Sequence, residues 1–250
     1  MSRWAACVLV ALSVIFGSGR FSASRAAEQV DLLLVLAADV SRSIDDQKFE
    51  LERRGYAAAL SDPKVLQAIA AGPHGKIAVA FVEWAGANSQ KLLIDWTLVR
   101  GVEDTKVFTS RLLEQPRSFA DRTAIGAGID FARAQFARAP YSSDRRVIDV
   151  SGDGTNNSGR DVRSARDEAV SNDVTTINGL VIFSDAPIPY NPEHTNPPGG
   201  LDNYYRENVI GGTNAFVMAA ENFDSFGRSI VAKLIREISA APSSRALSPG

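Results

Sequence analysis

Several residue types and patterns on which protein chemistry often depends are scarce or absent in this sequence. Its 250 residues include one cysteine, Cys7, and two histidines, His74 and His194. Neither histidine lies in a motif, so we expect both to be exposed turn residues rather than catalytic groups. The sequence contains no Gly-x-Ser-x-Gly segment, which would hold the nucleophile of a hydrolase. No stripe of basic residues stands out, which argues against nucleic acid as a partner.

The N-terminus has the features of a secretory signal peptide. Arg3 is followed by an apolar stretch from Trp4 to Phe16 and then by small residues from Ser22 to Ala27. A permanent membrane anchor would need a longer apolar span than this one. We therefore predict that residues 1–26 are removed on export, leaving no membrane anchor, and that the protein is periplasmic or extracellular. Cys7 leaves with this segment, which excludes disulfides and thiol chemistry in the mature chain.

Apolar runs alternate with helical patterns along residues 28–240, which we predict to form one domain. Val30 to Ala38 is almost continuously apolar, as expected for a central parallel strand covered on both faces. Further strands are expected at residues 76–84, 91–99, 146–150, 174–183 and 215–220, and the main helices around 49–60, 102–113, 123–138, 161–172 and 223–238. The alternation predicts an α/β fold with a doubly wound, mostly parallel open sheet and helices on both faces. The segments 76–84 and 91–99 predict a hairpin that adds one antiparallel edge strand. Residues 241–250 are expected to be a disordered tail.

Three distant segments supply oxygen side chains at the boundaries of these expected elements. Asp39, Ser41 and Ser43 form a D-x-S-x-S segment after the first strand, Thr123 opens a helix, and Asp153 follows another strand. Ligand sites in doubly wound sheets form at the carboxyl ends of strands, so we expect these five side chains to lie together. Hydroxyl and carboxylate oxygens suit Mg²⁺, Mn²⁺ or Ca²⁺ rather than Zn²⁺. Taken singly, each segment is also a common capping or turn sequence.

The order of D-x-S-x-S, then Thr, then Asp-Gly resembles the metal-ion-dependent adhesion site of von Willebrand factor A domains. The resemblance covers residues 30–239. With residues 145–154, 201–206 and 209–212, the chain looks like a bacterial secreted subfamily of these domains with an uncharacterised role. In that family, an acidic residue of the partner completes the coordination of the cation. The resemblance therefore implies a protein or peptide partner that presents Asp or Glu.

The resemblance also implies a role for each site residue. Ser41, Ser43 and Thr123 would coordinate the cation, most often Mg²⁺, directly or nearly so. Asp39 and Asp153 would act largely through bound water. The favoured function is thus an exported binding module, and not an enzyme.

Two other functions remain open from the sequence. A metal-dependent phosphoester hydrolase of related fold would typically need a second aspartate two residues after the first, where this chain has Ser41. A structural envelope protein would use the metal only to make its loops rigid. A binding module differs from such a protein because it requires an accessible coordination position.

Two further features carry expectations of their own. Residues 184–200 are rich in proline and are expected to form a long loop on the metal-bearing rim. The loop would either shape a partner surface with Tyr190, Tyr204 and Tyr205 or cover these tyrosines as a stiff surface loop. Asp149, within an apolar strand, is expected to form hydrogen bonds at the end of the sheet.

Overall fold

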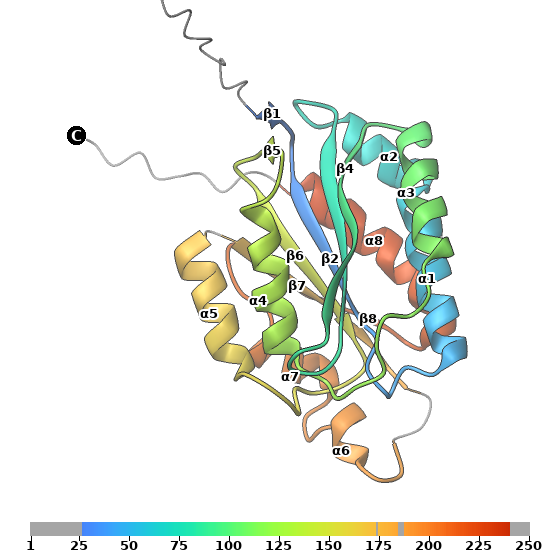
Figure 1. The fold of residues 1–250 in the computed structure, drawn as a ribbon, viewed down its shortest axis with the longest axis vertical. Helices are drawn as coiled ribbons and strands as arrows, with labels where there is room; N and C mark the ends of the chain where they lie inside the picture. The colour runs from blue at the N-terminus through green and yellow to red at the C-terminus, as the bar shows by residue number, and fades with distance from the viewer. Residues whose placement is uncertain (1–26, 174, 185–187, 241–250) are drawn as a thin grey trace, which may run out of the picture.

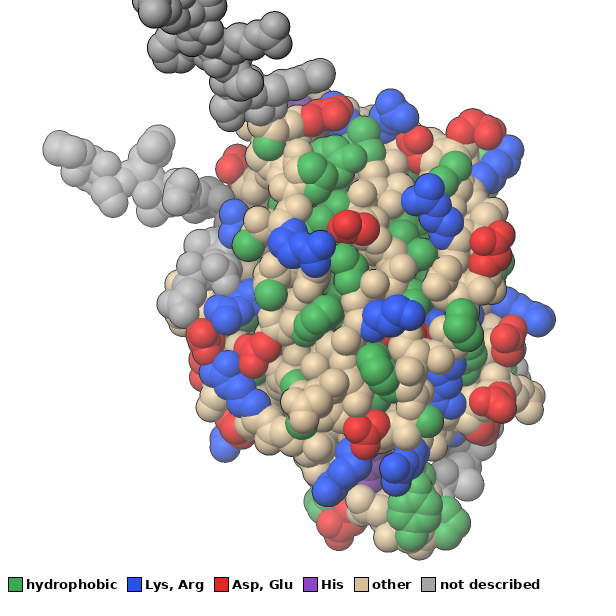
Figure 2. Space-filling view, viewed as in Figure 1, with side chains coloured by type: hydrophobic (Ala, Val, Ile, Leu, Met, Phe, Trp, Pro, Cys, Tyr) green, Lys and Arg blue, Asp and Glu red, His purple; other side chains and the backbone are tan. Residues whose placement is uncertain are grey.

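The computed structural model describes residues 27–173, 175–184 and 188–240 of the chain (Figure 1). The predicted signal peptide, residues 1–26, and the predicted tail, residues 241–250, lie outside the described residues. Within the described part of the chain, no helix combines the length and the apolar character needed to cross a membrane. On the face shown in Figure 2, acidic and basic side chains are interspersed among hydrophobic ones.

Six strands form the central sheet, in the order β4-β3-β2-β6-β7-β8. They are β2 (Leu33–Asp39), β3 (Ile77–Trp84), β4 (Gln90–Val99), β6 (Arg146–Gly152), β7 (Thr175–Ile182) and β8 (Val217–Ala220). Neighbouring strands are parallel except β3 and β4, which form the expected antiparallel hairpin at one edge. A separate short parallel pair joins β1 (Glu28–Gln29) to β5 (Tyr141–Ser142). The predicted doubly wound, mostly parallel sheet is confirmed.

Helices cover both faces of this sheet (Figure 1). One face packs against α1 (Asp46–Leu60), α2 (Pro63–Ala70), α3 (Val102–Glu114) and α8 (Phe226–Ser239), and the other against α4 (Ile125–Phe136), α5 (Val162–Asp173) and α7 (Leu201–Asn208). In β2, Leu34 and Leu36 belong to the first apolar cluster, whereas Leu33 and Val35 belong to the second. Successive side chains of a strand point to opposite faces, so this two-sided burial requires the continuous apolar run.

The strand order places a switch point between β2 and β6. The chain adds β3 and β4 on one side of β2, and later adds β6, β7 and β8 on the other side. In open α/β sheets, ligand sites form outside the carboxyl ends of the strands at such a point. Asp39 is the last residue of β2, and Asp153 directly follows β6. The topology therefore brings these two carboxylates together at the carboxyl ends of the neighbouring strands β2 and β6.

Two expectations about irregular segments need correction. Residues 184–200 were expected to form a loop, but they contain the one-turn helix α6 (Pro192–Thr195). The helix α7 forms where only a connection was expected, and it buries Leu201 and Tyr205. A helix this short has few apolar positions, so its periodicity is too weak to be recognised in the sequence. The 3₁₀ turn η1 (Phe223–Ser225) similarly replaces the first turn of the closing helix.

Asp149 also lies elsewhere than expected. It occupies the middle of β6, between Leu36 of β2 and Asn178 of β7, rather than the end of the sheet. Its Oδ1 atom is 2.6 Å from Nζ of Lys233, which also lies 2.5 Å from Oε1 of Glu237. Burial raises the pKa of Glu237 to about 7 and raises that of Asp149. Lys233 of α8 thus partly neutralises two carboxylates inside the core.

Candidate metal site

The D-x-S-x-S segment turns where β2 ends. Oδ1 of Asp39 accepts a hydrogen bond of 2.7 Å from the backbone N–H of Ser41. Short bonds of this kind, from a residue to the backbone two positions later, stabilise a tight turn. Nη2 of Arg117 donates to the carbonyl oxygens of Val40 and Ser41 at 2.8 and 2.6 Å. The N–H of Val40 donates to the carbonyl of Trp84 at 2.8 Å, so the turn is fixed from both sides.

Asp153 joins this turn through Ser43. Oγ of Ser43 donates to Oδ1 of Asp153 at 2.5 Å and lies 3.1 Å from Oγ of Ser41. Because β2 and β6 are adjacent parallel strands, the two segments that follow them meet at the same edge. The structure therefore links Asp39, Ser41, Ser43 and Asp153 in one chain of hydrogen bonds.

Thr123 lies on a neighbouring loop and has a different side-chain partner. Its Oγ1 atom is 3.2 Å from Nε2 of His194 in α6. Its N–H donates to Oδ1 of Asn157 at 3.0 Å, and the N–H of Asn157 donates to its carbonyl at 2.8 Å. The N–H of Arg42 donates to the carbonyl of Asp121 at 2.9 Å, which ties the Thr123 loop to the D-x-S-x-S turn.

His194 is buried, contrary to the expectation of an exposed turn residue. Only 5% of its surface is exposed, and burial lowers its pKa. The ring approaches the chain at Gly154, where a Cβ atom would come within 2.3 Å of Nε2. The N–H of Thr155 donates to the His194 carbonyl at 2.9 Å, which holds α6 against the Asp153 loop. His74, in contrast, is exposed as expected.

Burying the two carboxylates of the site in their ionised form costs free energy unless a positive charge lies close to them. Asp39 and Asp153 are fully buried, and within the described part of the chain Oδ2 of each has no hydrogen-bond partner, although Nζ of Lys48 lies 3.8 Å from Oδ2 of Asp153. Burial, and then the charge of Asp153, raises the pKa of Asp39 to about 8, and burial also raises the pKa of Asp153. A divalent cation would compensate this charge and supply the missing partner for each oxygen. Together with the three hydroxyls of Ser41, Ser43 and Thr123, the donor set fits a hard cation.

Three further residues lie beside the site, and of these Lys48 was not expected there from the sequence. Nζ of Lys48 in α1 is 3.8 Å from Oδ2 of Asp153 and donates to the Ser43 carbonyl at 3.1 Å. The buried hydroxyl of Tyr205 has no hydrogen-bond partner among the residues that the structure describes. A Cβ atom on Gly152 would lie 2.6 Å from that hydroxyl and 3.1 Å from Oδ2 of Asp39. The phenol and the carboxylate therefore converge on a position where only glycine fits.

The tyrosines associated with the proline-rich segment have different environments. Tyr190 is 79% exposed, whereas Tyr205 is completely buried. The hydroxyl of Tyr204 accepts a hydrogen bond of 3.1 Å from the N–H of Asn156. Tyr190 is thus exposed at the outer surface and Tyr204 is half-buried, whereas Tyr205 lies in the core.

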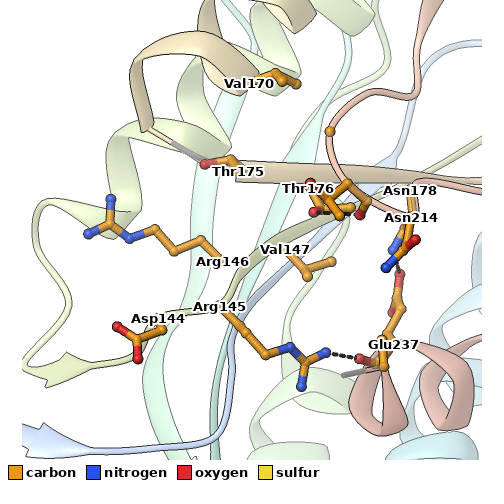
Figure 3. Close-up of a pocket in the computed structure, with 13 residues that line it drawn as sticks. Asp144, Arg145, Arg146, Val147, Val170, Thr175, Thr176, Asn178, Asn214 and Glu237 are labelled. Carbon is orange, nitrogen blue, oxygen red and sulfur yellow. Dashed lines mark hydrogen bonds between the residues drawn. The ribbon is translucent and has the colours of Figure 1, made fainter. Parts of the chain in front are cut away.

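A cavity of about 110 Å³ lies at the opposite end of the sheet (Figure 3). Arg146 and Thr175, at the starts of β6 and β7, line it together with Asn178 and Glu237. Nη1 of Arg145 donates to the Ile238 carbonyl at 3.0 Å, and Nδ2 of Asn178 donates to Oε1 of Glu237 at 2.8 Å. The cavity includes none of the five predicted metal ligands. It is separate from the candidate site.

Several solved structures share the fold of this chain at low sequence identity. The chain matches proximal thread matrix protein 1 from the mussel byssus, in a structure with a zinc-occupied MIDAS motif, with a TM-score of 0.58 and 13% identity over 85% of this chain and 49% of that chain. It matches a von Willebrand factor type A structure from Catenulispora acidiphila with a TM-score of 0.51 and 14% identity over 84% of this chain and 43% of that one. The pilus adhesin SpaC from Lactobacillus rhamnosus GG gives a TM-score of 0.57 and 12% identity over 86% of this chain and 30% of the adhesin. The chain thus spans about half the length of the mussel protein, and has the fold of von Willebrand factor A domains.

A family model covers nearly all of the described chain. The model of a family described as protein of unknown function, DUF1194, matches residues 29–242, and the chain belongs to this family. A comparison with curated proteins found no match. The family and the fold together agree with the predicted subfamily of von Willebrand factor A domains.

Proposed function

We propose that this protein is an exported binding module that uses a divalent cation to bind an acidic group of a protein or peptide partner. The ligands would be Asp39, Ser41, Ser43, Thr123 and Asp153. The observation that carries the proposal is the chain of hydrogen bonds through Asp39, Ser41, Ser43 and Asp153, in which, among the described residues, Oδ2 of each buried carboxylate has no hydrogen-bond partner. The zinc-occupied motif of the mussel protein, which shares the fold, supports a cation in this class of site.

The charges around the site favour an acidic partner. Two carboxylates would balance one divalent cation, but Lys48 lies beside Asp153, and Arg117 binds the carbonyl oxygens of the D-x-S-x-S turn. Arg117 also pairs with Asp46, whose Oδ1 lies 3.8 Å from its Nη1, so Lys48 is the basic side chain left beside the proposed cation. A carboxylate of the partner would meet both the cation and Lys48, which strengthens its binding.

The same residues offer less to a hydrolase. Ser41 stands where a phosphoester hydrolase of related fold would typically need a second aspartate, and its Oγ faces Ser43. We expect no turnover of phosphoesters, peptides or esters that depends on Asp39 and Asp153. A metal-dependent rate that either substitution abolishes, in a protein that still folds, would favour the enzyme instead.

Thermal denaturation tests the cation. A ligand that binds only the folded state at a hundred times its Kd stabilises that state by about 2.7 kcal/mol. Divalent cations should therefore raise the Tm of the wild type, and Asp39→Ala and Asp153→Ala should lose most of this response. Asp161→Ala removes an exposed carboxylate and serves as the matched control. An equal response in all variants would place the cation elsewhere.

Affinity capture tests the partner. Material from the parent cell envelope should bind the wild type with the cation present and be released by a chelator. Thr123→Ala should weaken this capture more than it lowers stability, because one neutral donor at the rim is lost. Amidation of the partner's Asp or Glu should abolish capture. Capture that survives both the chelator and Thr123→Ala would show that the cation is not the docking point.

Export has its own test. Intact-mass measurement of the protein from an exporting host should give a mature chain that begins near Glu28 and lacks Cys7. Recovery of an uncleaved chain held in the membrane would contradict the proposed location.

A further inference from the structure

Two buried carboxylates share a single buried lysine between α8 and the central sheet. Nζ of Lys233 lies 2.6 Å from Oδ1 of Asp149 in β6 and 2.5 Å from Oε1 of Glu237, one turn further along α8. All three side chains are completely excluded from solvent. One ammonium group balances only one carboxylate, and a like charge nearby disfavours ionisation of the second acid. The cluster is therefore neutral only when the two carboxyl groups hold one hydrogen ion between them.

Glu237 also joins α8 to the sheet by hydrogen bonds. Its Oε1 accepts a bond of 2.8 Å from Nδ2 of Asn178 in β7, and Oδ1 of Asn178 accepts one of 3.1 Å from the N–H of Phe216. Among the described residues, Oε2 of Glu237 has no hydrogen-bond partner. Burial, and then the charge of Asp149, raises the pKa of Glu237 to about 7. Ionised Glu237 would thus be buried with one oxygen uncompensated, which costs free energy.

The cavity of Figure 3 lies beside this cluster. Glu237 and Asn178 both line it, and its volume of about 110 Å³ is room for several water molecules, each of which occupies about 30 Å³. A small movement of α8 away from the sheet would let this water reach the Glu237 carboxylate. Hydration favours the ionised form, so the carboxyl group holds its hydrogen ion less tightly in the opened position than in the packed one.

Tyr56 and several charged residues surround the cluster. Burial, and then the charge of Asp149, raises the pKa of Tyr56 in α1, so its hydroxyl stays neutral. Arg145 donates to the carbonyl oxygens of Glu237 and Ile238, which ties the last turn of α8 to the start of β6. The remaining charged neighbours are the basic Arg146 and Arg236 and the exposed acidic Asp144. Arginine keeps its charge at all pH values used here, so the carboxyl pair is the part of this environment that responds near neutral pH.

We propose that Asp149, Lys233 and Glu237 form a pH-sensitive latch, which holds the C-terminal turns of α8 on the sheet while the carboxyl pair keeps its hydrogen ion and which loosens as the pH rises. The packed state binds one more hydrogen ion than the opened state, so rising pH favours opening. For Glu237, the stabilisation is fully present below pH 4.5 and is lost as the pH rises through about 7. From these two values, the opened fraction should increase about tenfold between pH 6 and pH 8. This inference goes beyond the proposed function and requires no cation.

Hydrogen exchange of the mature protein, measured by mass spectrometry with a chelator present, follows the opening of residues 233–239. After correction for the intrinsic pH dependence of exchange, protection in the wild type should fall about tenfold from pH 6 to pH 8. Glu237→Gln keeps an acceptor for Asn178, and Asp149→Asn leaves Lys233 to Glu237 alone. Each variant should therefore change by less than about twofold over this range. Glu221→Gln, which alters an exposed glutamate before α8, is the matched control and should behave as the wild type.

A ¹³C NMR titration of the carboxyl groups tests the shared hydrogen ion without any substitution. Asp149 and Glu237 together should take up one hydrogen ion as the pH falls from about 9 to about 5. Two carboxyl groups that both stay ionised over this range, or protection that is equal at pH 6 and pH 8, would overturn the latch. A Glu237→Gln protein whose pH dependence matches that of the wild type would overturn it as well.

Discussion

Glu52 offers a quantitative test of the electrostatics behind the candidate site. This residue of α1 is 3% exposed, and its Oε1 accepts a hydrogen bond of 2.8 Å from Oγ of Ser151, which in turn accepts one from Tyr56. Burial, opposed by the Ser151 bond and reinforced by the charge of Asp39, raises the pKa of Glu52 from 4.5 to about 8. In the folded protein, Glu52 therefore keeps its hydrogen in a pH range where it loses it in the unfolded chain.

The sign and size of the effect on stability follow from this shift. Between pH 4.5 and pH 8, the folded state holds one more hydrogen ion at Glu52 than the unfolded state, so the free energy of unfolding falls as the pH rises. The contribution of Glu52 to the free energy of unfolding is fully present below pH 4.5 and is lost as the pH rises toward 8. Each tenfold change in the acid dissociation constant corresponds to about 1.4 kcal/mol. Between pH 5 and pH 8, this one group should lower the stability by about 3 to 4 kcal/mol.

Glu52→Gln removes the titrating group but keeps an oxygen that accepts from Ser151. The assay is urea denaturation from pH 5 to pH 8 with a chelator present, since a nearby cation would itself change the pKa of Glu52. Glu52→Gln should match the wild type within about 1 kcal/mol at pH 5 and exceed it by about 3 kcal/mol at pH 8. Glu50→Gln, whose carboxylate on the same helix is 59% exposed, is the matched control. Parallel pH profiles for the wild type and Glu52→Gln would refute the reasoning.

Two further substitutions test other parts of the fold. Lys233→Met should destabilise the protein by about 3 to 5 kcal/mol in urea denaturation at pH 7, because it leaves Asp149 and Glu237 buried without their cation; a loss below about 1 kcal/mol would show that the lysine is not needed there. Gly154→Ala should displace the His194 ring, which its new Cβ would approach to 2.3 Å. Limited proteolysis should then cut the α6 segment several times faster than in the wild type, and an unchanged cleavage pattern would contradict the close packing.

Local sequence patterns were enough to predict the sheet and the meeting of four of the five oxygen side chains at one end of it. The run from Val30 to Ala38 predicted a central strand, and the structure has it at Leu33–Asp39, because a strand buried on both faces must be apolar at every position. The hairpin through Gly86 was recognised for a similarly local reason. Parallel strands have their carboxyl ends on one side of the sheet, so residues at or just after those ends, Asp39 and Asp153 among them, were expected to lie together. The structure links four of the five predicted ligands in one chain of hydrogen bonds.

Tertiary structure alone decided which other groups surround these oxygens. His194 is in a proline-rich segment without periodicity, and its place beside Thr123 depends on how that segment folds back over the rim. Lys48 and Tyr205 reach the site from two helices that cover opposite faces of the sheet. Asp149 meets Lys233 in the core although the two are far apart in the sequence. Local patterns report which side of a strand or helix is buried, whereas the identity of the side chain that meets it is set by packing between distant segments.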